Sequence, residues 1–312
     1  MYKQFYNLKR NPFEITPDPE FLFASAKHQI ALTAICYGIL GRKGFVVMTG
    51  EVGTGKTLLV RSLLKVMTHQ SMACSYVFNS KLDPCDFLRL VAYDFGLTGS
   101  GKSKGELLIE LNSYLLACHQ KKITAVLVID EAHHLSTEVL EEIRLLMNLE
   151  TPKEKLLQIL LVGQPELDAK LDSFELRQLK QRIAVRCQLE PLNQEETMEY
   201  IQNRLRVAGS ECSDAANLFP SDAVAIIHQY SRGIPRLINL VCENALLIAC
   251  DSRVRRITPA ILDAIACNFR LTESGLVSTE SSQKSELWQS VKNLLEFHDL
   301  SDRTSHEVEH FE

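Results

Sequence analysis

The strongest chemical pattern in the chain is GEVGTGKT at 50–57, which has the spacing G-x-x-x-x-G-K-T. It directly follows the apolar run FVVM at 45–48 and opens into LLVRSLL at 58–64. A β-branched run that ends in glycines and continues as an apolar-rich segment predicts a strand, a tight loop and a helix. A loop in that setting binds phosphate, because its backbone N–H groups and the positive helix N-terminus face the anion.

Each residue type in this loop has a chemical task. We expect Gly50, Gly53 and Gly55 to adopt positive φ, so that successive N–H groups turn inward around a β-phosphate. Lys56 would reach the β- and γ-phosphates, and Thr57 would hold Mg²⁺. The predicted ligand is therefore ATP with Mg²⁺. The residues expected to bind it in this stretch are Gly50, Glu51, Val52, Gly53, Thr54, Gly55, Lys56, Thr57 and Leu58.

A second motif, AVLVIDE at 125–131, is an apolar strand that ends in two carboxylates. Asp130 would contact Mg²⁺ through its water shell, and Glu131 would polarise the water that attacks the γ-phosphate. Two acids at the end of a buried strand are costly unless a cation or polar ligand lies beside them. Thr57 and Asp130 are therefore the predicted metal residues, and Glu131 joins Lys56 as a predicted catalytic residue.

The motif continues through Ala132 and His133, which complete the letters DEAH, and His134 follows. Other helicase motifs are not evident, and we do not interpret His133 as a metal ligand. At the end of the next apolar strand, Gln164 places an amide where it would sense the γ-phosphate, so it is also a predicted catalytic residue.

Two arginines are predicted to act on the same phosphate. Arg182 lies at a helix-to-strand junction with two other arginines, Arg177 and Arg186, and is our candidate for an arginine finger that enters a neighbouring subunit. Arg236 follows Pro235 at a helix start, where the helix dipole disfavours a cation unless an anion lies nearby. We therefore expect Arg236 to contact the nucleotide.

The bulk composition indicates an ordinary soluble protein. The chain has 312 residues, of which 46% are hydrophobic and 23% charged, and its nine cysteines form no C-x-x-C pair. Scattered cysteines favour reduced thiols over a disulfide framework or a zinc site. No segment has the length and apolarity of a signal peptide or a membrane span. The formal charge of −5 gives no overall attraction for nucleic acid.

The apolar pattern predicts an α/β fold. Continuous apolar strands at 74–78, 125–129, 156–162 and, more weakly, 184–189 alternate with helical stretches. Such strands are typical of a parallel sheet that lies between helices. After residue 191 the strand signal disappears, and four helices with N-terminal caps or Pro at their first position predict a small all-helical lid.

We therefore divide the chain into four parts. They are an N-terminal lead-in packed on the core (1–44), a nucleotide-binding α/β domain (45–190), a helical lid domain (191–268), and a polar linker with a short C-terminal helix or tail (269–312).

These motifs, in this order, resemble an AAA+ ATPase core with its lid. Longer strings resemble, more narrowly, the ExeA/GspA-type ATPases of bacterial secretion and pilus systems, with the greatest likeness to those of mannose-sensitive haemagglutinin (MSHA) pilus biogenesis. These strings are NPF at 11–13, PDP at 17–19, NLET at 148–151, GQPELD at 163–168, RQL at 177–179, QRI at 181–183 and RLRVAG at 204–209. The resemblance implies that Gln164, Arg182 and Arg236 are sensor 1, arginine finger and sensor 2.

The resemblance also implies a function. It indicates an ATP-hydrolysing homo-oligomer that supports assembly of an MSHA-like type IV pilus or a related secretion or envelope complex. Relatives of the ExeA type continue into a membrane span and a peptidoglycan-binding module. Because this sequence shows neither, we expect a cytoplasmic protein that reaches the inner membrane through a membrane partner.

Two alternatives stay open. Transposition- and initiator-type ATPases that bind DNA share this core, and RVRR at 253–256 is a local basic cluster, although the net charge and the lack of a recognisable helix-turn-helix argue against DNA. The other alternative is a nucleotide-controlled binding module with negligible turnover, which an intact Glu131 disfavours.

Overall fold

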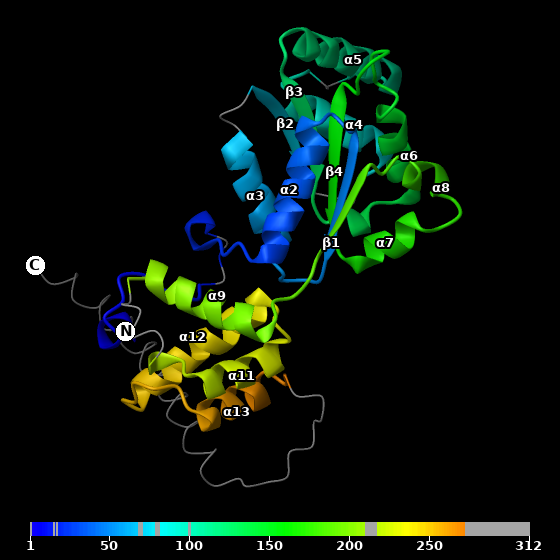
Figure 1. The fold of residues 1–312 in the computed structure, drawn as a ribbon. Helices are drawn as coiled ribbons and strands as arrows, with labels where there is room; N and C mark the ends of the chain where they lie inside the picture. The colour runs from blue at the N-terminus through cyan, green and yellow to red at the C-terminus, as the bar shows by residue number, and fades with distance from the viewer. Residues whose placement is uncertain are drawn as a thin grey trace, which may run out of the picture. The chain divides into compact units, whose positions relative to one another are not determined.

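The protein consists of two compact units. The computed structural model describes residues 2–14, 16, 18–67, 71–78, 82–98, 101–209 and 217–271 (Figure 1). Within these residues the α/β unit runs from residue 16 to 196 and takes in 233–236, and the helical unit contains the rest. None of the helices described there has the length and apolarity needed to cross a membrane.

The α/β unit is built on a five-stranded sheet in which every strand pair is parallel. The strand order is β2-β3-β4-β1-β5. The strands are β1 (Phe45–Gly50), β2 (Met72–Val77), β3 (Thr124–Ile129), β4 (Leu157–Gly163) and β5 (Val185–Leu189). The predicted α/β class is therefore confirmed, and even the weakest strand signal forms β5 at the sheet edge.

Helices cover both faces of this sheet, as Figure 1 shows. Side chains that alternate along β1 enter different cores: Val46 and Met48 pack with one face, and Phe45 and Val47 with the other. This two-sided burial explains why the strands are continuously apolar. The first face carries α2 (Ala26–Leu40) and α3 (Lys56–Met67). The second carries α4 (Pro84–Asp94), α5 (Lys104–Gln120), α6 (Thr137–Leu146), α7 (Pro165–Leu171) and α8 (Arg177–Lys180).

Parallel pairing places the carboxyl ends of the central strands along one edge. Thr49 lies opposite Gly163, and Ile129 lies opposite Leu161. The loops that follow β1, β3 and β4 therefore leave the sheet side by side, at the edge where open α/β sheets bind their ligands. The predicted catalytic and metal-binding residues of the α/β unit, apart from Arg182, follow these strands.

The helical unit contains α1 (Tyr2–Phe5), most of α9 (Gln194–Val207), α11 (Ser221–Ser231), α12 (Pro235–Asp251) from Leu237 onward and α13 (Pro259–Asn268). Local signals start these helices. The N–H of Glu196 donates to the Asn193 side chain at 2.8 Å, and the Glu196 carboxylate accepts from the Asn193 N–H at 2.9 Å. This reciprocal pair is a capping box. Thr258 takes the N-cap position of α13 without a side-chain cap bond.

The first fourteen residues correct the expected lead-in, because those described pack in the helical unit and not on the α/β core. Phe13 is fully buried and lies edge-on to Phe219, with ring centroids 5.8 Å apart. The Arg204 side chain donates to the Pro12 carbonyl, and the Tyr2 hydroxyl donates to the Glu243 carboxylate at 2.8 Å. The aromatic and proline pattern indicated packing but carried no signal for which unit receives it. The predicted C-terminal linker and helix, from residue 272 on, lie outside the described residues.

Candidate active site

The loop from Gly50 to Gly55 leaves β1 and enters α3 as the sequence predicts. Gly53 and Gly55 have φ of 83° and 97°, in the region that favours glycine. Gly50 differs from the prediction, because it is not among the residues with positive φ. A Cβ there would lie 2.5 Å from the Leu189 carbonyl oxygen, so glycine serves close packing against β5.

Lys56 begins α3 and is 6% exposed. Its ammonium donates to the carbonyl oxygens of Gly50 at 2.7 Å and Glu51 at 2.9 Å. Burial lowers the pKa of Lys56, and the nearby carboxylates of Glu131 and Asp130 oppose that shift. The ammonium is therefore held at the start of the loop, where a phosphate oxygen would replace the Gly50 and Glu51 carbonyls as its acceptor.

Asp130 gathers three hydrogen-bond donors although it is only 6% exposed. Its Oδ2 accepts from the Thr57 hydroxyl and the Tyr76 hydroxyl, each at 2.8 Å. Its Oδ1 accepts from the Glu131 N–H at 2.9 Å. Thr57 and Asp130, the two predicted metal residues, are thus in direct contact, and a hydroxyl beside a carboxylate is an oxygen-only donor set that suits Mg²⁺.

Tyr76 at the end of β2 was missed by sequence reasoning, since one tyrosine in an apolar strand carries no distinctive signal. Burial raises the pKa of its phenol, and the charge and hydrogen bond of Asp130 raise it further. The phenol therefore stays protonated and donates to Asp130. It thereby holds the same carboxylate oxygen, Oδ2, to which the Thr57 hydroxyl donates.

Glu131 follows Asp130 in the left-handed region, with φ of 53°, which is uncommon for a residue with a side chain. Its side chain is 47% exposed. The Gln164 amide, at the start of α7, donates to Glu131 Oε2 at 3.4 Å, and His133 Nδ1 lies 3.4 Å from the same oxygen. The structure thus brings Gln164 and Glu131 together, with one carboxylate oxygen held by neighbours.

Arg236 also reaches the phosphate-binding loop. Residues 233–236 belong to the α/β unit, and the Arg236 N–H donates to the Gly53 carbonyl at 3.2 Å. A Cβ on Gly53 would lie 2.7 Å from the Arg236 Cβ, so glycine is needed there for contact as well as for its positive φ. Arg236 is therefore packed on the loop that precedes Lys56.

Comparison with known proteins agrees with this geometry. Residues 39–171 match the family described as "AAA domain". The chain is 42% identical over 250 residues to general secretion pathway protein A of Aeromonas hydrophila, a match that covers 80% of this chain and 45% of that protein. The chain belongs to the ExeA/GspA family of AAA+ ATPases. It spans less than half the length of that relative.

Solved structures support the AAA+ ATPase fold. The Drosophila origin recognition complex bound to DNA matches with a TM-score of 0.60 at 16% identity, covering 96% of this chain and 79% of that one. The Aeropyrum pernix ORC1 protein in complex with DNA also has a TM-score of 0.60 at 16% identity, covering 83% and 69%. The Thermotoga maritima RuvB branch migration motor has a TM-score of 0.51 at 17% identity, covering 80% and 70%. At these identities the likeness shows the fold alone.

The three arginines at the junction of α8 and β5 have their contacts outside the hydrogen-bonded group around Asp130. Arg182 donates to the Asn148 side chain at 2.8 Å and to the Arg144 carbonyl at 3.2 Å. The Arg186 guanidinium pairs with Asp168 at 3.2 Å, and Arg177 stacks over Phe174 at 4.1 Å. The structure therefore does not bring Arg182 to the loop of its own chain.

His28 supports the phosphate-binding loop from α2, a second contact that sequence reasoning missed. Its Nε2 lies 3.4 Å from the Thr54 carbonyl oxygen, and its Nδ1 lies 2.8 Å from the Ser25 hydroxyl. Because a carbonyl only accepts, Nε2 carries the proton and Nδ1 accepts from Ser25. Burial lowers the pKa of His28, against a raising effect of the Thr54 hydrogen bond and the Glu196 charge. The imidazole is therefore a neutral brace behind the loop.

Proposed function

We propose that this protein binds ATP with Mg²⁺, hydrolyses it, and uses the cycle to support assembly of an MSHA-like type IV pilus or a related secretion or envelope complex. The single observation that best supports hydrolysis is a series of hydrogen bonds at the carboxyl ends of the central strands. Thr57 bonds Asp130, the Glu131 N–H bonds Asp130, and Gln164 bonds Glu131. A metal-binding pair is thereby joined to a carboxylate that can act as a general base.

The chemistry assigned to each residue follows from its place. The loop N–H groups would hold the β-phosphate, and Lys56 would exchange its carbonyl acceptors for phosphate oxygens. Thr57 and Asp130 would hold Mg²⁺, which when bound supplies neutralisation of the phosphate charge. Glu131 has one oxygen engaged by Gln164, which leaves the other to accept a proton from water.

The arginines support an oligomeric ATPase. Arg236 packs on the loop through its backbone and Cβ, so its guanidinium would act as sensor 2 within the chain. Arg182 is held on α6 of its own chain, away from its own loop. Its proposed role as arginine finger therefore requires a neighbouring copy, and we propose a homo-oligomer with the nucleotide at the subunit boundary.

The cellular role rests on the relative. The protein named general secretion pathway protein A shares 42% identity with this chain, which supports a secretion-related role. The narrower assignment to an MSHA-like pilus is supported by the sequence strings alone. We propose a cytoplasmic ATPase that meets the inner membrane through a pilus or secretion partner protein.

A DNA-binding ATPase is the second candidate, because the side chains of the 253–256 cluster are exposed. Arg256 lies 4.0 Å from Asp222, and Arg255 stacks over Phe5 at 5.7 Å, so part of this charge has partners in the helical unit. A DNA-binding ATPase would show ATP-dependent affinity for duplex DNA that falls steeply with salt. A salt titration of DNA binding by the full chain distinguishes the two candidates.

Hydrolysis is tested by multiple-turnover phosphate release from the full chain. We expect Glu131→Gln to retain ATP binding while turnover falls by about 10²- to 10⁴-fold, because the general base is lost. Lys56→Ala should lose nucleotide binding itself. Glu138→Gln, an exposed acid in the first turn of α6, is the matched control and should keep wild-type turnover. Normal turnover by Glu131→Gln would contradict the assigned mechanism.

The partner is tested with the same variant. Glu131→Gln should remain in its ATP-bound form, so affinity purification in ATP should recover pilus-assembly or secretion membrane proteins. Lys56→Ala, treated identically, should lose them. Recovery of DNA-bound factors in their place would favour the second candidate.

A further inference from the structure

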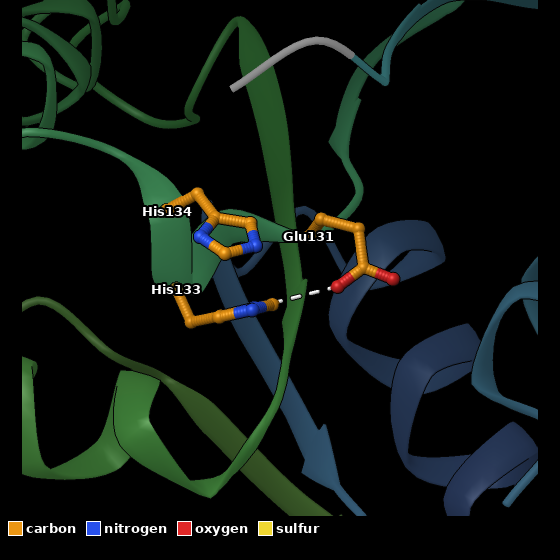
Figure 2. A group of neighbouring side chains, drawn as sticks. All are labelled: Glu131, His133 and His134. Carbon is orange, nitrogen blue, oxygen red and sulfur yellow. Dashed lines mark ion pairs between the residues drawn. The ribbon is translucent and has the colours of Figure 1, made fainter. Parts of the chain in front are cut away.

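A group of three side chains with metal-ligand chemistry lies directly after β3. Glu131, His133 and His134 each contribute one ligand atom, and these atoms all lie within 4.8 Å of one another. Figure 2 shows the His133 ring directed at the Glu131 carboxylate, with the His134 ring beside it. The two imidazoles are 3.9 Å apart between centroids. The nucleotide site described above uses Glu131 but neither histidine.

The backbone of this turn is fixed by contacts outside the group. It forms the 3₁₀ turn η2 (Ala132–His134), and Lys170 from α7 donates to the carbonyls of His133 at 2.7 Å and Leu135 at 2.8 Å. A fixed backbone limits the conformational entropy that three ligands lose when they converge on one ion. The two imidazoles are therefore already placed next to the carboxylate.

The polar contacts of His133 favour a cation between it and Glu131. The Gln164 N–H points at His133 Nδ1 from 3.5 Å, a contact that requires Nδ1 to present its lone pair. The same nitrogen lies 3.4 Å from Glu131 Oε2, which is also an acceptor. Two lone pairs that face each other at this distance repel unless a positive charge, from a proton on Nδ1 or from a metal ion, lies between them.

The donor set selects the ion. Two imidazoles with one carboxylate form a zinc site of the open type, with a fourth position left for water. Mg²⁺ prefers oxygen ligands in an octahedron, which Thr57 and Asp130 suit and this group does not. We propose, against the expectation from the sequence, that Glu131, His133 and His134 form a Zn²⁺ site separate from the Mg²⁺ position.

Occupation of this site would inhibit the ATPase, a consequence that rests on the proposed function. Coordination of Oε2 to Zn²⁺ withdraws electron density from the whole carboxylate, so the other oxygen of Glu131 becomes a poorer base for water. His134 is exposed and His133 is 7% exposed in its side chain, so Zn²⁺ would enter past His134. Free zinc would thus stop the cycle while leaving the phosphate loop unchanged.

The binding arm uses the full chain in nucleotide-free, Mg²⁺-free buffer. Exposed thiols such as Cys267 are first blocked with iodoacetamide, because thiolates also bind zinc. Co²⁺ is then titrated and its visible absorption followed, with Zn²⁺ added to displace it. We expect one Co²⁺ per chain, and at least tenfold weaker binding in both His134→Asn and His133→Asn.

His119→Asn is the matched control. His119 pairs with the single carboxylate of Glu154 at 3.2 Å and is not part of a three-ligand group among the described residues. It should bind Co²⁺ and Zn²⁺ as the wild type does. Wild-type affinity in His134→Asn, or no Co²⁺ absorption in the wild type, overturns the site.

The activity arm separates this inference from the proposed function. Zn²⁺ should lower wild-type phosphate release at least tenfold, whereas His134→Asn should keep its zinc-free turnover and lose the zinc sensitivity. Turnover in His134→Asn that zinc still inhibits equally overturns the inhibitory role. If no chain hydrolyses ATP, the proposed function fails and the Co²⁺ titration still decides the metal site.

Discussion

Each of the two units buries a charged side chain, and the two are satisfied in different ways. Asp130 in the α/β unit is 6% exposed and accepts from two hydroxyls and an N–H. Arg204 in the helical unit is 5% exposed. Its guanidinium donates to the carbonyls of Pro12 and Glu14 and to the Tyr200 hydroxyl.

The difference lies in what surrounds each charge. Asp130 stands at the sheet edge, next to a half-exposed Glu131 and the phosphate loop, so its oxygens can still meet a cation. Arg204 is enclosed, and its partner Pro12 lies 192 residues away in sequence. A buried charge with neutral partners can therefore serve chemistry at an open edge, or tie distant chain segments together in a closed core.

The largest effect is expected when the enclosed charge of Arg204 is removed. Arg204→Ala leaves buried acceptors on Pro12 and Tyr200 without this donor, and unsatisfied buried groups cost about 1–3 kcal/mol each. We expect the helical unit to lose about 3 kcal/mol or more by this estimate. Hydrogen exchange should show lost protection in residues 2–14, α9 and α12, while β1, β3 and β4 stay protected.

Arg206→Ala is the control for that result, because Arg206 is exposed on the same helix and bonds only locally to Asn203 among its described contacts. Its effect should stay within about 0.5 kcal/mol. Equal loss of protection in the strands of the α/β unit would show that the two units do not respond separately.

A smaller effect is expected when Asp130, the charge at the open site, loses one hydrogen-bond donor. Tyr76→Phe removes one hydroxyl donor from Asp130 Oδ2 and keeps the aromatic ring. One hydrogen bond to a charged group is worth about 1.5–3 kcal/mol, so the Mg²⁺ concentration that gives half-maximal turnover should rise about tenfold. A metal titration of phosphate release measures it. Tyr93 lies on α4 and is 73% exposed, so Tyr93→Phe is the control and should leave the Mg²⁺ titration unchanged. If the Mg²⁺ titration of Tyr76→Phe matches that of the wild type, Tyr76 does not position Asp130 for the metal.

The smallest effect is the pH response of the loop's brace. Burial lowers the pKa of His28 below its ordinary 6.5, so the unfolded chain takes up the proton first. The stability that this neutral imidazole provides is complete above 6.5 and is lost as the pH falls through that value toward the folded pKa.

We therefore expect acidification from about pH 7.5 to about pH 5.5 to lower wild-type stability by about 1 kcal/mol more than that of His28→Gln. Urea unfolding at several pH values measures the two slopes. Ser25→Ala keeps the imidazole buried and should keep the wild-type slope. Parallel slopes for the wild type and His28→Gln would show that His28 does not titrate differently on folding.

Sequence reasoning located the elements whose signals are local. The phosphate loop, the acidic end of β3 and the capping box at Asn193 each depend on residues within a few positions of one another, and the structure has all three. The continuous apolar strands gave the parallel sheet for the same reason, since burial on both faces leaves its mark on every strand.

Contacts between distant segments were not predictable from these patterns. Tyr76 and Asp130 lie 54 residues apart, and His28 and Thr54 lie 26 apart, so no spacing marks either pair. The packing of Pro12 and Phe13 in the helical unit depends on Arg204 and Phe219, far along the chain. The role of a single polar residue in an apolar stretch depends on a partner that only the folded chain brings close, so the sequence pattern does not predict it.

The order of the strands has one more consequence. Because β4 lies between β1 and β3, the amide of Gln164 stands between the strand that carries the phosphate loop and the strand that carries Glu131. Neighbouring strands are about 4.8 Å apart, so a glutamine side chain that follows β4 is long enough to reach the residue after β3. Under the proposed mechanism, rotation of this one amide would tell Glu131 whether a γ-phosphate is present, without movement of a domain.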